Sequence, residues 1–181
     1  FRCADIAMYA AKHELRGYAF YRGASDHFTP ERLSLQSDLA HAIRSGELAL
    51  YYQPKISLTD GSLSGFEALL RWMHPKRGMV SPMQFIPLAE NTELIHPLTR
   101  WVIREALQQV AHWQARGRSV PVAVNISVNN LHDPAFVEDL ATMLTESRMP
   151  PGLLELEVTE SALMNHPELA LQRLNQIRAL G

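Results

Sequence analysis

The sequence predicts an α/β fold in which parallel strands are covered by helices. After a pair of strands that read as a hairpin, the remaining segments alternate helix, strand, helix, strand and helix. Such alternation requires crossover connections, which place neighbouring strands parallel. With 181 residues, 46% of them hydrophobic, the chain can bury a sizeable core, and one domain is the default expectation. The pattern leaves open whether the strands form an open sheet or part of a barrel.

The first quarter of the chain reads as a helix, a short strand, a linker and a second helix. Residues 4–17 are rich in helix formers, and residues 18–21 form a short aromatic strand. Residues 23–30 are polar and turn-rich, as expected of a linker. The second helix starts at Pro30, which suits a first helical turn, and ends at Gly46.

A hairpin follows. Residues 48–56 and 63–72 read as strands, and the Asp-Gly pair at 60–61 predicts the tight turn between them. A loop rich in Pro and Gly at 74–82 and a short helix at 83–90 come next.

The rest of the sequence alternates between helices and strands. A long amphipathic helix is predicted at 98–115, because apolar residues recur at helical spacing. A short apolar strand at 122–127 and a helix at 134–146 follow. The last two elements are a strand at 153–159 and a helix at 168–180.

Composition excludes several functions. The formal net charge of -2 argues against binding a nucleic-acid polymer or a membrane surface through bulk charge. Cys3 is the only cysteine, which rules out disulfides and thiolate zinc sites within one chain and favours a reducing, cytoplasmic location. No apolar run is long enough for a membrane span. The chain starts at Phe1 and stops as a helical pattern closes, so we expect a piece of a longer protein.

Polar residues stand inside strands that otherwise look buried. Strand alternation puts Glu67 and Arg71 on one face of their strand. Three neighbouring strands would each deliver an oxygen ligand near their C-terminal ends, from Glu67, Asn125 and Glu157. Two carboxylates and an amide form a hard ligand set that suits Mg²⁺ or Mn²⁺ rather than Zn²⁺. The spacing is equally compatible with surface carboxylates, or with carboxylates that pair with Arg71.

Other catalytic signatures are absent from the sequence. The eight histidines have no metal-binding spacing, and no glycine-rich phosphate loop or serine or cysteine triad pattern occurs. The strand carboxylates are therefore the residues on which a functional prediction depends.

Four motifs in order resemble the EAL domain family of cyclic-di-GMP phosphodiesterases. They are YYQP at 51–54, EALLRW at 67–72, NIS at 125–127 and EVTES at 157–161. The resemblance covers residues 33–181 and implies a modified TIM barrel, of which this chain would hold the first half and so be incomplete as given.

The N-terminal segment resembles a different family. Residues 4–12 look like the closing helix of a GGDEF (diguanylate cyclase) domain, and residues 18–21 look like its last strand. The resulting domain prediction is a GGDEF tail at 1–23, a linker at 24–32 and the N-terminal part of an EAL domain at 33–181.

The resemblance implies a metal site and a reaction. Glu67, Asn125 and Glu157 match the family's metal ligands, and the two glutamates count as catalytic. The family reaction is metal-assisted hydrolysis of one phosphodiester bond, which opens cyclic-di-GMP to linear pGpG in bacterial signalling.

Four further positions carry roles implied by the resemblance. Gln53, Leu70 and Arg71 match residues that contact the dinucleotide, with Arg71 suited to a phosphate. Glu160 matches a residue that stabilises an active-site loop.

The resemblance also sets expectations for the parent protein. The family's paired aspartates, a lysine and a later glutamate would lie beyond Gly181, so we expect residues 1–181 alone to be inactive. The alternative to an enzyme is a cyclic-di-GMP receptor or regulatory EAL domain without catalysis. Upstream GGDEF and sensory domains, a homodimer through the complete EAL domain, and an upstream anchor in the inner membrane would belong to the parent.

Overall fold

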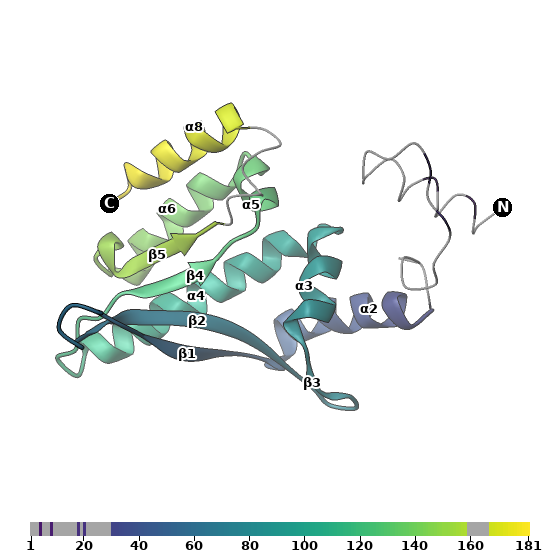
Figure 1. Cartoon of the computed structure of the whole chain (residues 1–181), viewed down its shortest axis with the longest axis horizontal. Helices are drawn as coiled ribbons and strands as arrows, with labels where there is room; N and C mark the ends of the chain where they lie inside the picture. The colour runs from purple at the N-terminus through teal and green to yellow at the C-terminus, as the bar shows by residue number, and fades with distance from the viewer. Residues whose placement is uncertain (1–3, 5–7, 9–17, 19, 21–29, 159–166) are drawn as a thin grey trace. The chain divides into compact units, whose positions relative to one another are not determined.

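The computed structural model describes residues 4, 8, 18, 20, 30–158 and 167–181 (Figure 1). The chain divides into two compact units, Phe1–Asp38 and Leu39–Gly181. Most of the predicted leading helix and strand, and the segment 24–29 of the linker, lie outside the described residues. Ala4 and Met8 are helical, whereas Tyr18 and Phe20 belong to no strand.

Helix α2 spans Pro30–Ser45, as predicted. Gly46 follows with a φ of 76°, in the left-handed region that residues with a Cβ rarely adopt. This glycine allows the chain to leave the helix and enter the sheet within two residues, so the sequence signal and the structure agree on the helix end.

The predicted hairpin is confirmed. Strand β1 (Leu48–Ile56) pairs antiparallel with β2 (Leu63–His74). In the turn between them Gly61 has a φ of 71°, and Asp60 accepts hydrogen bonds from the backbone and hydroxyl of Ser62. Strand β2 is two residues longer than predicted.

The predicted loop at 74–82 is partly wrong, because it contains strand β3 (Gly78–Val80), which pairs antiparallel with the end of β2. The His74 ring explains the reversal, since its Nδ1 accepts hydrogen bonds from the backbone N–H groups of Lys76 and Arg77 at 3.1 and 3.2 Å. Gly78, with a φ of 69°, completes the turn. Helix α3 (Pro82–Glu90) follows.

The parallel part of the sheet is also confirmed. Strand β4 (Val122–Asn125) lies parallel between β2 and β5 (Leu154–Glu157), which gives the order β1-β2-β4-β5 with β3 on β2. The connecting helices are α4 (Ile95–Gln114), α5 (Val128–His132), α6 (Phe136–Ser147), the 3₁₀ turn η2 (Pro151–Leu153) and α8 (Pro167–Arg178). Helix α5 was not predicted, because five residues are too few to show a periodicity.

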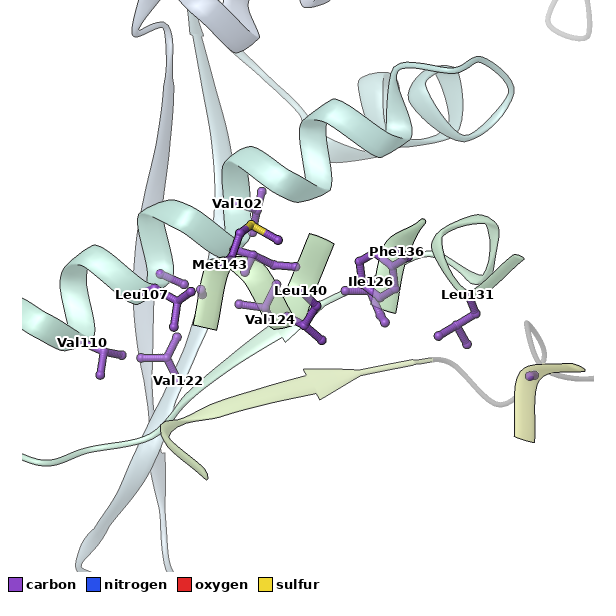
Figure 2. Close-up of a cluster of buried hydrophobic side chains, with 14 residues drawn as sticks. Val102, Leu107, Val110, Val122, Val124, Ile126, Leu131, Phe136, Leu140 and Met143 are labelled. Atoms are coloured by element: carbon purple, nitrogen blue, oxygen red, sulfur yellow. The ribbon is translucent and has the colours of Figure 1, made fainter. Parts of the chain in front are cut away.

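One face of the sheet is buried by a cluster to which α4, α5 and α6 contribute (Figure 2), and Ala170 of α8 belongs to the same cluster. Val122 and Val124 of β4 belong to the same buried cluster as the apolar side of α4, whereas Ala123 and Asn125 point to the other face of the sheet. The buried members of this cluster are Ala68, Val102, Ile103, Ala106, Leu107, Val110, Val122, Val124, Ile126, Leu131, Phe136, Leu140, Met143 and Ala170.

None of the helices in the described residues is both long and apolar enough to cross a membrane.

Truncation of Leu140 tests this core. Leu140 on α6 is 1% exposed, so Leu140→Ala leaves a cavity and should lower the free energy of unfolding by about 2–5 kcal/mol. Leu58, fully exposed in the β1–β2 turn, is the matched control, and Leu58→Ala should change stability by less than about 0.5 kcal/mol. Urea unfolding followed by tryptophan fluorescence measures both values. Equal losses from the two variants would contradict the packing described above.

Candidate active site

The face of the sheet opposite the helices carries most of the predicted site residues. Gln53 lies opposite Glu67 in the β1–β2 register, and Asn125 lies beside Glu157 in the β4–β5 register. Glu67 is paired with Ala123, two residues before Asn125. Because side chains alternate along a strand, Gln53, Glu67, Arg71, Asn125 and Glu157 all project from this one face.

Glu67 and Asn125 are in direct contact. The Nδ2 of Asn125 donates a hydrogen bond of 2.8 Å to Oε1 of Glu67, across 58 residues of sequence. Glu67 is half-buried and Asn125 is exposed, so the pair lies at the edge of the packed region. The amide carbonyl oxygen of Asn125 takes no part in this hydrogen bond.

Asn125 and Glu157 are linked through the backbone. The N–H of Ile126, directly after Asn125, donates a 2.9 Å hydrogen bond to the carbonyl of Glu157. The two strands therefore stay paired up to the point at which both predicted ligands occur, and the three oxygen-bearing side chains are held on adjacent strands.

A lysine that the sequence reading missed also lies on this face. The Nζ of Lys55 is 2.7 Å from Oε2 of Glu155 and 3.3 Å from Oε1 of Glu157. Its hydrogen bond to Glu155, and secondarily that to Glu157, raises the pKa of Lys55 above its ordinary value. The available signal was its strand parity, because Lys55 follows Gln53 by two residues and shares its face.

Arg71 lies at the far end of β2 from the turn. Its Nη1 donates a 2.9 Å hydrogen bond to the backbone carbonyl of Leu70, and its guanidinium carbon lies 5.5 Å from the centroid of the Tyr51 ring. Among the described residues no carboxylate forms an ion pair with Arg71, so the alternative in which it neutralises the strand glutamates has no support there. A half-buried guanidinium that pairs with no carboxylate of the described residues is suited to an anionic ligand.

Two predicted site residues are not brought into this group. The side chain of Leu70 projects from the opposite face of β2 and packs against the buried cluster, so only its backbone carbonyl reaches toward Arg71. Glu160 lies outside the described residues.

The donor atoms fit a divalent metal. Glu67, Asn125 and Glu157 offer carboxylate and amide oxygens, the donors that hard cations prefer. The Lys55 ammonium, already beside Glu157, shows that this position attracts positive charge. In the described part of the chain no three His, Cys, Asp or Glu side chains are grouped to hold a metal, so the candidate set depends on the amide of Asn125.

The arrangement defines a class of protein: an α/β sheet with oxygen-bearing side chains gathered on one face of adjacent parallel strands, where Asn125 and Glu157 end β4 and β5. Glu67 lies in the middle of β2 rather than near its C-terminal end as predicted, because β2 continues past the end of β4 to pair with β3. Residues 36–181 match the EAL domain family, and the chain belongs to that family.

Comparison with known proteins agrees with this assignment. The chain is 39% identical over 180 residues to the bifunctional diguanylate cyclase/cyclic di-GMP phosphodiesterase MucR of Pseudomonas aeruginosa, covering 98% of this chain and 26% of MucR. It is 39% identical over 181 residues to the cyclic di-GMP phosphodiesterase PdeR of Escherichia coli strain K12, covering 99% of this chain and 27% of PdeR. The chain therefore spans about a quarter of the length of these curated relatives.

A solved structure gives the same result for the fold. The PaMucR phosphodiesterase in complex with c-di-GMP matches with a TM-score of 0.78 and 39% identity, over 82% of this chain and 60% of that one.

The Lys55 ion pairs should be weak and dependent on salt. The side chains of Lys55, Glu155 and Glu157 are 37–47% exposed. Lys55→Met should therefore lower the free energy of unfolding by at most about 1 kcal/mol in dilute buffer at pH 7. In 0.5–1 M salt the loss should be smaller, because salt screens the charges. Because the pKa of Lys55 is raised on folding, this contribution is fully present below the ordinary lysine pKa and is lost as the pH rises through the folded value. Urea unfolding of both proteins at two salt concentrations tests this. A loss independent of salt would point to packing of the lysine stem.

Proposed function

We propose that the protein to which this chain belongs hydrolyses cyclic di-GMP to linear pGpG at the polar face of the sheet. The observation that carries the proposal is the convergence of Glu67, Asn125 and Glu157 on adjacent strands, with a 2.8 Å contact between the first two. The likeness to cyclic di-GMP phosphodiesterases, and to a phosphodiesterase solved with c-di-GMP, supports this substrate.

Glu67, Asn125 and Glu157 would hold Mg²⁺ or Mn²⁺, and the two glutamates are the proposed catalytic residues. A bound divalent ion polarises a phosphoryl oxygen and lowers the pKa of a bound water. The chain's own part is to place carboxylates where positive charge is needed and to keep Asn125 against Glu67. Lys55 on β1 balances the charge of Glu155 and Glu157, which both lie on β5.

Arg71 and Gln53 would contact the dinucleotide. Arg71 carries a charge suited to a phosphate, and Gln53 offers amide donor and acceptor groups from the exposed surface of β1. Leu70 enters this set through its backbone carbonyl, which holds the guanidinium of Arg71. The role of Glu160 in stabilising a loop stays a prediction.

The wider organisation of the parent is also proposed. Residues 1–23 would close a GGDEF domain and residues 24–32 would link it to the EAL domain, which the match to bifunctional MucR over 98% of this chain supports. The described sheet would form the first half of a modified TIM barrel, and the match of this chain to 60% of the solved PaMucR chain supports this. Upstream GGDEF and sensory domains and a homodimer through the complete EAL domain complete the proposal.

Replacement of Glu67 tests the reaction in the full-length protein. Glu67→Gln keeps the size of the side chain and removes its charge, so pGpG production with Mg²⁺ or Mn²⁺ should fall by at least about a hundredfold. Glu157→Gln should behave in the same way. Chromatographic separation of cyclic di-GMP from pGpG measures turnover.

Glu155→Gln is the matched control for Glu157→Gln. Glu155 is a glutamate on the same strand and face that also pairs with Lys55, but it is not a proposed ligand, so this variant should keep most of its turnover. Equal losses from Glu155→Gln and Glu157→Gln would remove the specific assignment. A wild-type protein that binds cyclic di-GMP without producing pGpG would be a receptor.

A further inference from the structure

A buried hydrogen-bonded pair lies behind the proposed metal site. Thr99 on α4 is 5% exposed and Asn130 on α5 is 1% exposed. The hydroxyl of Thr99 donates to Oδ1 of Asn130 at 3.0 Å, between two elements separated by 31 residues of sequence. Neither residue has been given a role by the reaction proposed above.

The same Asn130 oxygen accepts a second hydrogen bond, from the backbone N–H of Ser127 at 3.2 Å. An amide oxygen has two lone pairs, so these two donors use its full capacity. Ser127 is the N-cap of α5, and its N–H lies two residues beyond Asn125. Thr99 therefore fixes the Asn130 side chain, and Asn130 fixes the backbone that leaves strand β4.

Two consecutive amides after Asn125 are thus held from different directions. The N–H of Ile126 donates to the carbonyl of Glu157, and the N–H of Ser127 donates to Asn130. With both amides restrained, the strand cannot rotate at its end without breaking one of these bonds. The side chain of Asn125 is consequently directed at Glu67 rather than left free at the end of the strand.

The buried pair of Thr99 and Asn130 carries a penalty in folding stability. The Nδ2 of Asn130 is buried and finds no hydrogen-bond partner among the described residues. An unsatisfied buried amide donor destabilises a core, and a leucine here would remove that donor but leave the Thr99 hydroxyl and the Ser127 N–H without their acceptor. Leu131, the next residue in the chain, and Ile126 are apolar members of the buried cluster (Figure 2). Asn130 is the N3 residue of the α5 capping box, so this polar side chain sets the geometry of the turn that follows β4.

We propose that Thr99 and Asn130 are positioning residues that hold Asn125 in place as a metal ligand. The inference rests on the proposed function, because it assumes that Asn125 binds the metal. Thr99 touches neither metal nor substrate and acts only through Asn130 and the turn after β4. Helix α4, which covers the outer face of the sheet, would in this way determine the orientation of a side chain on the other face.

Thr99→Val and Thr99→Ser separate positioning from packing. Valine keeps the shape and removes the hydroxyl, whereas serine keeps the hydroxyl and removes a methyl group. Positioning predicts that Thr99→Val raises the Kd for Mn²⁺ by roughly three- to tenfold while Thr99→Ser stays within about twofold of wild type. A purely structural role predicts the reverse order, because the serine variant loses buried apolar contact.

Binding of Mn²⁺ to the full-length protein, measured by electron paramagnetic resonance without substrate, gives the readout. Thr142→Val is the matched control, since Thr142 is an exposed helical threonine whose hydroxyl donates to the carbonyl of Glu138 in its own helix. Val110→Ala, a cavity variant elsewhere on α4, controls for lost stability and should leave the Kd unchanged. Circular dichroism melting reports folding of every variant.

The possible outcomes separate this inference from the reaction. If Thr99→Val binds Mn²⁺ as tightly as wild type, or Thr99→Ser binds more weakly than Thr99→Val, the positioning role is overturned. Should Thr99→Val fail to fold, a Kd for Thr99→Ser raised beyond about twofold overturns it as well. If wild type binds Mn²⁺ but produces no pGpG, hydrolysis fails while the Thr99 comparison still decides positioning. A wild type that binds no Mn²⁺ overturns the positioning role, and it overturns hydrolysis as well if Mg²⁺ supports no turnover.

Discussion

The in-register pairing of β2, β4 and β5 is the constraint on which the rest of the structure depends. Parallel strands at fixed register place equivalent residues side by side, and alternation along each strand sends every second side chain to the same face. A slip of one residue would turn Glu157 into the core and Leu156 out to the open face. The hydrophobic cluster beneath the helices therefore also determines where the proposed oxygen ligands are.

The two faces of this sheet have opposite physical requirements. Helices α4, α6 and α8 need an apolar surface to cover, and the even-numbered residues of β2, β4 and β5 provide it. The other face accumulates carboxylates; among the described residues Lys55 offsets part of that charge, and the neutral Asn125 amide donates a hydrogen bond to Glu67. Like charges on neighbouring strands are unfavourable without a counter-charge, and a surplus of this kind is what a cation site requires.

Much of this arrangement could be predicted from sequence, for identifiable reasons. The hairpin follows from Asp60-Gly61, and the parallel strands follow from the alternation of element types. The shared face of Glu67 and Arg71 follows from parity alone. Strand β3 was missed because the His74 ring replaces a backbone partner in the turn, which a reading of Pro and Gly positions cannot detect. The Lys55 pairs join residues 100 and 102 positions apart, so no local pattern contains them.

The sequence by itself determined the element types, the side of each strand that is polar, and the motifs by which the EAL domain family is identified. These are local properties, because periodicity, turn residues and short motifs act over a few neighbours along the chain. Only the tertiary structure decided which carboxylate meets the Asn125 amide, that Leu70 packs into the core while its carbonyl holds Arg71, and that Thr99 contacts Asn130. Those contacts depend on the register between strands and on how α4 packs against the turn after β4, which are set by the whole core acting together.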